Sequence, residues 1–225
     1  MRMHLSSASP DEPTGFAPPR IARRGSTSAY ALTVVLLHGK GSNEEQIIAL
    51  ADQLPTGPSY IAVRAPIAEA GGFAWFANRG VGRPVAESLA ETMQWFRTWL
   101  DEAVPGPVLL VGFSGGAAFA GGLILSDPER FAGAAILSGT LPFDAGVPVT
   151  PGRLDGVPMF VSQGETDTVI PAELLYDTWK YLTGPAGADT TAVLEIGGHK
   201  ISADVVEKLS AWITRQVSRA RRGTE

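Results

Sequence analysis

Short, continuous runs of apolar residues alternate along this chain with longer segments in which apolar residues recur every three or four positions. Continuous runs are typical of strands buried on both faces of a parallel sheet, whereas the recurring pattern is typical of helices that bury one face. The runs predict strands at residues 31–37, 60–63, 108–111, 134–137, 157–161 and 192–196. The recurring segments predict helices at residues 43–54, 85–104, 172–182 and 205–213. The small and apolar residues 117–124 predict a further, close-packed helix.

This alternation of strands and helices predicts an α/β fold with a mostly parallel, doubly wound sheet and helices on both faces. With 225 residues, 44% of them hydrophobic, the chain is long enough to bury one sizeable core. We therefore expect a single domain over residues 30–222. Residues 1–29 are rich in Ser, Pro, Gly and Arg and are expected to form a flexible arm that adds one edge strand near Ile21.

Local signals place three boundaries. Ser42 precedes two glutamates and is expected to cap the first helix, because a serine hydroxyl accepts hydrogen bonds from the free N–H groups of a helix start. Pro171 is expected as the first helical residue of the segment 172–182. Residues 64–84 form no strand or helix pattern and carry three aromatic residues, so we expect a long irregular loop that serves a binding site.

Composition narrows the classes of partner. The net charge of −5 gives no reason to expect nucleic acid or an acidic substrate, and a small or neutral ligand fits better. The chain has no cysteine, which excludes disulfides, thiolate metal sites and a cysteine nucleophile. We see no secretory signal and no apolar stretch long enough to span a membrane, so we expect a cytoplasmic protein without stable membrane association.

The segment Gly112-Phe113-Ser114-Gly115-Gly116 matches the pattern G-x-S-x-G, between a predicted buried strand and a predicted helix. A serine on such a sharp turn has its hydroxyl lifted clear of the sheet, beside the N–H groups at the start of the helix. The pattern alone is weak in a chain with 26 glycines, and the alternative is an ordinary glycine-rich turn. The flanking strand and helix favour Ser114 as a nucleophile.

A serine hydroxyl is a weak nucleophile, so it needs a general base, and the base needs a carboxylate that orients it. Only one of the three histidines, His199, follows the serine, in the order that α/β-hydrolases use. Asp167 lies on a loop directly after a predicted buried strand and is the expected orienting acid, with Glu165 as its rival. The alternatives are a histidine that caps the last helix and an acid in a solvated turn.

Acyl transfer also needs two donors for the developing oxyanion. The backbone N–H of Gly115 follows the nucleophile, and the backbone N–H of Lys40 lies in the glycine loop after the first predicted strand. We expect these two groups to form the oxyanion hole and His38 to be structural. Trp75 and Phe76 are candidate residues of an acyl-binding wall, although aromatic residues that merely cover the sheet are as common.

With these residues assigned, the sequence resembles the phospholipase/carboxylesterase family of small α/β-hydrolases, from about residue 31 to about residue 213. The landmarks are residues 36–41, 64–66, 75–76, 112–116, 167, 169–171 and 197–199. The resemblance implies an α/β-hydrolase fold with no large lid domain, a triad of Ser114, Asp167 and His199, and no cofactor or metal. Two positions depart from the family: Gly115 stands where Gln is usual, and Lys40 stands where an apolar residue is common.

The expected function is that of a serine hydrolase that cleaves short- to medium-chain carboxylic esters through an acyl-serine intermediate. One alternative is an acyl thioesterase that uses the same triad. Another is a ligand-binding protein with the same fold and no catalysis. The expected partner is a small ester or thioester, and the sequence leaves a homodimer open.

Overall fold

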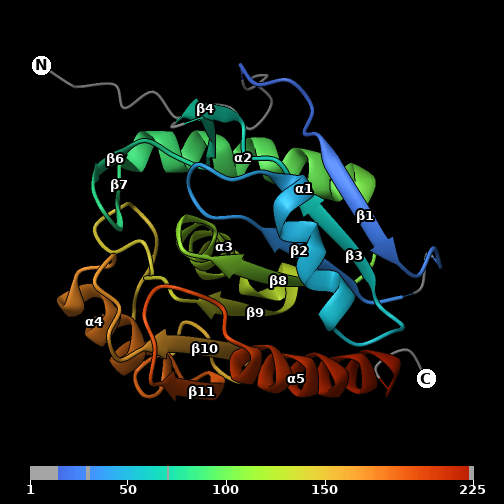
Figure 1. Cartoon of the computed structure of the whole chain (residues 1–225). Coiled ribbons are helices and arrows are strands. Elements are labelled where there is room, and N and C mark those ends of the chain that lie inside the picture. The colour runs from blue at the N-terminus through green and yellow to red at the C-terminus, as the bar shows by residue number, and fades with distance from the viewer. Residues whose placement is uncertain (1–14, 29–30, 70, 223–225) are drawn as a thin grey trace, which may run out of the picture.

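The computed structural model describes residues 15–28, 31–69 and 71–222. A seven-stranded sheet with the strand order β1-β3-β2-β8-β9-β10-β11 forms its centre (Figure 1). All neighbouring strands pair in parallel except β1, which is antiparallel to β3. The strands are β1 (Ile21–Gly25), β2 (Thr33–Leu37), β3 (Ser59–Val63), β8 (Val108–Phe113), β9 (Phe131–Leu137), β10 (Pro158–Gly164) and β11 (Asp189–Glu195).

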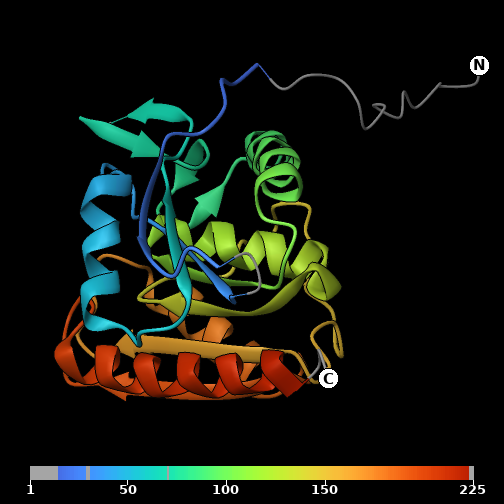
Figure 2. The same ribbon diagram turned by 90° about the vertical axis from the view of Figure 1, so that its right-hand side faces the viewer.

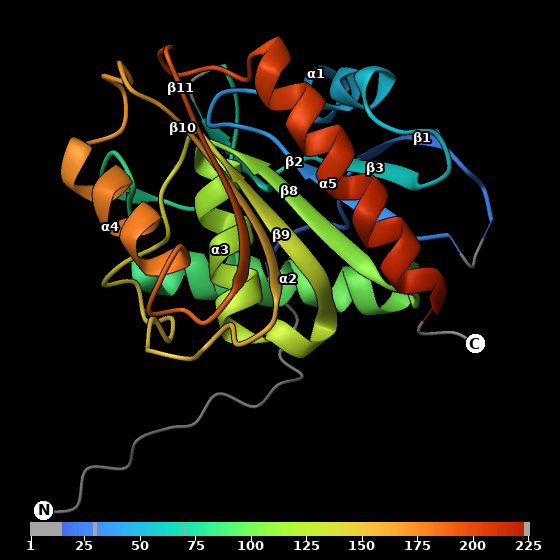
Figure 3. The same ribbon diagram turned by 90° about the horizontal axis from the view of Figure 1, so that it is seen from below.

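Helices cover both faces of the sheet and divide the core in two. The residues of α2, α3 and α4 that face inward form one apolar cluster, and those of η1 and α5 form the other. Figures 2 and 3 show α5 against one face and α2 and α3 against the opposite face. The helices are α1 (Glu44–Ile47), the 3₁₀-helix η1 (Ile48–Gln53), α2 (Ala86–Ala103), α3 (Gly115–Ser126), the 3₁₀-helix η2 (Pro128–Arg130), α4 (Ala172–Leu182) and α5 (Ala203–Arg222).

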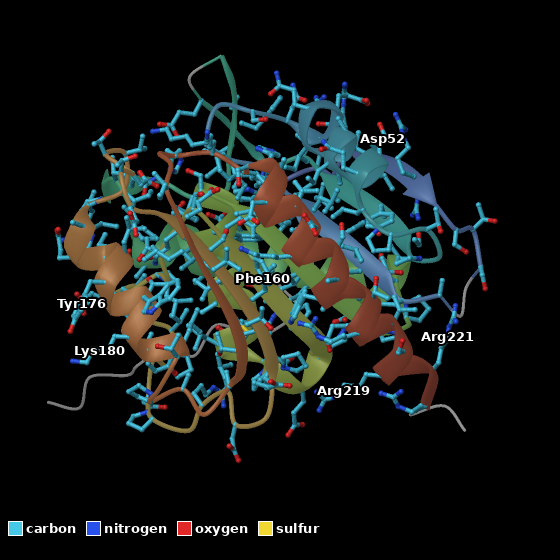
Figure 4. The ribbon with its side chains drawn as sticks, turned by 60° about the horizontal axis from the view of Figure 1, so that its bottom comes forward. Asp52, Phe160, Tyr176, Lys180, Arg219 and Arg221 are labelled. Carbon is cyan, nitrogen blue, oxygen red and sulfur yellow. The ribbon has the colours of Figure 1, made fainter. Side chains whose placement is uncertain are left out.

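The amphipathic helices follow the predicted pattern closely. In α4, for example, Leu174 and Leu182 are buried, while Tyr176 and Lys180 point outward (Figure 4). Burying one apolar stripe supplies most of the stability of such a helix, because a short isolated helix is only marginally stable in water. The mostly parallel α/β fold with helices on both faces is therefore confirmed.

The segment before β2 contributes to the domain. The expected edge strand near Ile21 is present as β1, and the backbone carbonyl of Ala17 accepts a 2.8 Å hydrogen bond from Trp95 Nε1 in α2. Phe16 packs edge-on against the same indole, with ring centroids 6.2 Å apart. The first part of the expected flexible arm, residues 1–14, and its last residue lie outside the described residues.

Three local expectations were wrong. The long loop at residues 64–84 contains two hairpins, because its short strands find antiparallel partners within the segment: β4 (Ile67–Glu69) pairs with β5 (Gly72–Ala74), and β6 (Asn78–Gly80) with β7 (Arg83–Pro84). The cap of the first helix is Asn43 and not Ser42, because the Asn43 side chain accepts the hydrogen bond from Gln46 N. The Ser42 hydroxyl instead donates to Gln46 Oε1.

The third concerns Pro171, which is not the first helical residue of α4. It is the cap residue that precedes the helix, with an extended ψ of 130°.

Along the described ranges, no helix combines the length and the apolar character that crossing a bilayer requires. No lid domain is added to the sheet in these ranges. The parallel strands end at one edge of the sheet, and the loops that follow them bring residues distant in sequence together there.

Candidate active site

Ser114 occupies a sharp turn between β8 and α3. Its backbone has φ 55° and ψ −115°, a region that non-glycine residues rarely adopt. The Ser114 N–H donates a 3.0 Å hydrogen bond to the carbonyl of Leu137 at the end of the neighbouring strand β9. The turn is therefore held against the sheet, and the side chain extends from its carboxyl edge.

The structure brings the three predicted residues into one hydrogen-bonded chain. His199 Nε2 lies 2.9 Å from Ser114 Oγ, and His199 Nδ1 lies 2.8 Å from Asp167 Oδ2. A carboxylate can only accept, so the neutral imidazole carries its proton on Nδ1 and leaves Nε2 free to accept the serine proton. The Asp167 side chain is fully buried, whereas 16% of the His199 side chain is exposed.

The second carboxylate oxygen of Asp167 fixes the orientation of the group. Oδ1 accepts hydrogen bonds from the N–H groups of Val169, at 2.8 Å, and Ile170, at 3.1 Å. The rival acid Glu165 is exposed, and none of its side-chain atoms forms a hydrogen bond or ion pair with another described residue. Asp167 is thus the acid that the fold presents to the imidazole.

A residue that sequence analysis did not assign to the site holds the histidine loop. Ser138, at the end of β9, is 1% exposed, and its hydroxyl donates a 2.9 Å hydrogen bond to the carbonyl of Lys200, next to His199. Its backbone φ of 42° turns the chain away from the strand at this point. The available signal was the Ser-Gly pair directly after a buried strand, but that signal does not identify the partner of the hydroxyl.

The two predicted oxyanion donors lie side by side. A Cβ atom built on Gly115 would lie 3.4 Å from Lys40 N. Gly115 begins α3, so its N–H has no partner within the helix, and neither amide donates to a backbone acceptor within the described part of the chain. Two free N–H groups beside a serine hydroxyl can stabilise an oxyanion. The Lys40 ammonium instead pairs with Glu69, at 2.5 Å.

A cleft of about 1020 Å³ opens at Ser114 and also reaches Lys40, Gly115 and His199. Phe76 lines it, as expected for an acyl-binding wall. Trp75 does not: its ring is 1% exposed and stacks on Phe119 with centroids 4.4 Å apart, so its assignment to the wall was wrong. The remaining apolar lining comes from Ile47, Val81, Phe113, Ala118, Val169, Ile170 and Ile201.

Residues 24–217 match the family model described as Phospholipase/Carboxylesterase. The chain belongs to the phospholipase/carboxylesterase family. It is 25% identical over 185 residues to "Putative hydrolase MhqD" of Bacillus subtilis. The aligned region covers 80% of this chain and 90% of the relative. It is 24% identical over 211 residues to a probable inactive carboxylesterase of Oryza sativa. That alignment covers 84% of this chain and 86% of the relative.

The fold of this phospholipase/carboxylesterase family member is shared with solved structures. The crystal structure of the Bacillus cereus carboxylesterase superposes with a TM-score of 0.77 at 23% identity, which covers 89% of this chain and 95% of that one. A carboxylesterase from Mesorhizobium loti gives a TM-score of 0.71 at 24% identity, with 81% and 88% covered. The α/β-hydrolase architecture predicted from the sequence is thereby confirmed.

In this family member a network behind Lys40 holds the loop of residues 38–43 between β2 and α1. Gly41 N donates to the carbonyl of Phe73 in β5, and Phe73 N donates to the carbonyl of Ser42. The Arg64 guanidinium lies 4.5 Å from the centroid of the Phe73 ring and makes two 2.6 Å hydrogen bonds to the Glu44 carboxylate. Because Glu44 is only 3% exposed, this ion pair ties α1 to the end of β3 from inside the protein.

We expect Glu44→Gln to lower the free energy of unfolding by about 2 kcal/mol at pH 7, because it leaves the Arg64 charge without its partner. Burial by itself would raise the pKa of Glu44, but the hydrogen bonds and charge of Arg64 outweigh it and lower that pKa below its ordinary value of 4.5. The pair therefore stabilises the fold above about pH 4.5, and its contribution is lost as the pH falls through the lowered value.

Urea denaturation of both proteins at pH 7 and at about pH 3.5 measures this effect. The difference between wild type and Glu44→Gln should narrow at the lower pH, because a protonated glutamate resembles glutamine. A difference of the same size at both values would contradict the ionic role of Glu44.

The remaining histidine of the site region is structural, as predicted. His38 is fully buried; its Nδ1 lies 2.8 Å from the carbonyl of Gly39, and its Nε2 accepts a 3.1 Å hydrogen bond from Ala65 N. Burial lowers the pKa of His38, so the ring stays neutral and links the loop after β2 to the segment after β3. Among the described residues no three His, Asp or Glu side chains gather in a way that could hold a metal ion.

The glycines around Ser114 differ in how much space they have. A Cβ atom at Gly116 would lie 2.1 Å from the Leu37 carbonyl oxygen, and neither backbone can move without disturbing the sheet. We expect Gly116→Ala to destabilise the protein by about 3 kcal/mol or more, which lowers Tm by roughly 6 to 12 °C. The matched variant Gly115→Ala meets only ordinary contacts and should change stability by less than about 1 kcal/mol. Thermal unfolding of the two variants measures the contrast; equal losses would contradict it.

Proposed function

We propose that this chain is a serine hydrolase that cleaves short- to medium-chain carboxylic esters through an acyl-serine intermediate. Membership of the phospholipase/carboxylesterase family supports a hydrolase. The observation that carries the finer proposal is the continuous hydrogen-bonded chain from Ser114 Oγ through His199 to the buried Asp167 carboxylate. A serine activated in this way, beside two free N–H groups, suits acyl transfer.

In the first half of the proposed reaction, Ser114 Oγ attacks the ester carbonyl carbon while His199 Nε2 takes its proton. The carbonyl oxygen becomes an oxyanion that accepts hydrogen bonds from the N–H groups of Lys40 and Gly115. The buried Asp167 carboxylate stabilises the imidazolium through its hydrogen bond to Nδ1. His199 then gives the proton to the alcohol oxygen, which leaves, and the acyl group remains on Ser114.

In the second half, a water molecule occupies the place of the departed alcohol. His199 removes a proton from this water as it attacks the acyl-serine carbonyl, and the same two N–H groups stabilise the second oxyanion. Collapse of this intermediate returns the proton to Ser114 Oγ and releases the carboxylic acid. The balance of the cycle is one ester and one water in, and one alcohol and one acid out.

The cleft supports a small substrate. Its volume of about 1020 Å³ and its apolar lining can enclose an acyl chain of moderate length. A thioester would fit the same machinery, because thiolates are good leaving groups that need little help from the imidazolium. A series of ethyl esters and the matching ethyl thioesters, each from two to twelve carbons in the acyl chain, would rank the two substrate classes and locate the preferred length.

A second candidate is a ligand-binding protein without catalysis, which the similarity to a probable inactive carboxylesterase favours. A fluorophosphonate probe separates the two functions, because it reacts only with a serine that is activated for nucleophilic attack. Covalent labelling of the folded wild type on Ser114 would support the hydrolase. Absence of labelling, together with no turnover of any ester or thioester in the series, would reject it.

A further inference from the structure

The charges around the cleft differ in sign from those of the whole chain. The chain carries a net charge of −5, but among the described residues three cations and no carboxylate line the cleft. The three cations are Lys40, Arg79 and Lys200. An ester that enters the cleft therefore meets positive charge on its walls, although the protein as a whole is acidic. Local charge of this kind, and not the net charge, decides which substrates a site favours.

The three cations are not equally available to a ligand. The Lys40 ammonium is neutralised by Glu69, at 2.5 Å. The exposed side chain of Lys200, the residue after His199, forms no ion pair within the described ranges. Arg79, in β6, likewise forms no ion pair with any described residue. Two cations on the cleft walls are therefore left without a carboxylate partner.

Arg79 is held in place without losing its charge. One terminal nitrogen of its guanidinium donates a 3.3 Å hydrogen bond to the backbone carbonyl of Asp144, and the Asp144 carboxylate itself forms no ion pair with it. On the same hairpin, Arg83 lies outside the cleft lining and is paired with Glu173, at 3.0 Å. The hairpin thus carries one arginine neutralised outside the cleft and one unpaired arginine on its wall.

Arg79 is exposed, and it shares the lining of the cleft with apolar residues. Phe76, Val81 and Ile170 line the same cleft, and Asn78 and Thr140 are the neutral polar residues of this part of the lining. A guanidinium presents parallel N–H donors that match the two oxygens of a carboxylate. Because Arg79 is exposed, water and dissolved salt screen part of this attraction. These features suit a ligand with an apolar body and one anionic end.

We propose that the preferred substrate is an ester that carries a free carboxylate, an inference that rests on the proposed ester hydrolysis. Arg79 binds this carboxylate, and Lys200 adds positive potential near His199. The neutral esters of the same length are poorer substrates of this cleft. Arg79 is then the residue that determines specificity in this enzyme. It takes no part in the proton transfers, which remain with Ser114, His199 and Asp167.

Two matched pairs of esters test the inference. Monoethyl glutarate and ethyl pentanoate differ in a carboxylate on the acyl side, and acetoxyacetate and ethyl acetate differ in a carboxylate on the alcohol side. Release of acid is followed by titration at constant pH. For at least one pair, the wild type should show a kcat/KM for the anionic ester about tenfold above that for the neutral one, as expected for a charged hydrogen bond near the surface.

Arg79→Gln should lower that ratio of anionic to neutral kcat/KM about tenfold, mainly through a higher KM for the anionic ester. The matched control Arg83→Gln removes the same charge from the same hairpin outside the cleft and should leave the ratio unchanged. Raising the salt concentration from about 0.05 M to about 0.5 M should lower the ratio for the wild type, because salt screens the attraction. This last measurement needs no variant and does not depend on the folding of Arg79→Gln.

The outcomes separate this inference from the proposed function. If the wild type cleaves the neutral esters as well as the anionic ones, or if Arg79→Gln and Arg83→Gln leave the ratio equally unchanged, the inference is overturned and the hydrolase remains. If no ester of either kind is cleaved and Ser114 is not labelled by a fluorophosphonate, the proposed function fails as well.

Discussion

Replacing Ser114 by alanine is expected to lower kcat for ester hydrolysis by roughly 10⁴-fold or more, the largest effect of any single substitution in this chain. The variant removes the nucleophile itself, so no acyl-enzyme can form. Binding of the ester should change little, because the cleft walls and the two oxyanion donors remain. The measurement is steady-state hydrolysis of the best ester from the chain-length series, with fluorophosphonate labelling in parallel.

The control for this experiment is the fold of the variant. Within the part of the chain that the structure describes, Ser114 Oγ has a hydrogen bond to His199 only, so its loss should leave the thermal unfolding temperature close to that of the wild type. A folded Ser114→Ala variant that keeps its activity would show that another residue attacks the ester. That result would remove the basis of the acyl-serine mechanism.

Asp167→Asn is expected to lower kcat by roughly 10³- to 10⁴-fold. The amide would present either a carbonyl, which cannot stabilise an imidazolium as a carboxylate does, or an NH₂ group, which forces the wrong tautomer of His199. An asparagine Oδ1 can still accept the hydrogen bonds from Val169 and Ile170, so the loop itself should survive. KM should stay within about threefold of the wild type, because Asp167 does not line the cleft.

Glu165→Gln is the matched control, since it neutralises a carboxylate two residues away that is exposed and does not touch the imidazole. We expect it to retain the activity of the wild type. If Glu165→Gln loses activity and Asp167→Asn keeps it, then the orienting acid is misassigned and the loop rearranges around the substrate.

Much of the fold and of the site could be predicted because their signals are local. The run Val108–Phe113 is apolar throughout and is followed by glycines around a serine, so both the strand and the turn after it can be recognised from a few residues. Parallel strands then place the loops at one edge of the sheet, which is why the order Ser114, Asp167, His199 sufficed to predict contacts between residues 85 and 32 positions apart.

What the sequence could not predict depends on contacts between distant segments. Whether Trp75 faces the cleft or the core is decided by the position of Phe119, 44 residues later, onto which the indole stacks. The role of Ser138 depends on the position of the Lys200 carbonyl, 62 residues later, to which its hydroxyl donates. Which of the two hairpin arginines is paired depends on Glu173, which contacts Arg83. Such pairings have no periodicity that a pattern along the chain could reveal.

The backbone conformation of Ser114 favours the proposed chemistry but is unfavourable for the stability of the fold. A positive φ at a residue with a Cβ atom costs roughly 1 to 2 kcal/mol that glycine would not incur. Glycine at this position would therefore relieve the turn, and a variant selected for thermal stability alone would lose the proposed nucleophile. If the proposed mechanism holds, the variant with the most stable backbone at this turn is one that cannot form an acyl-serine.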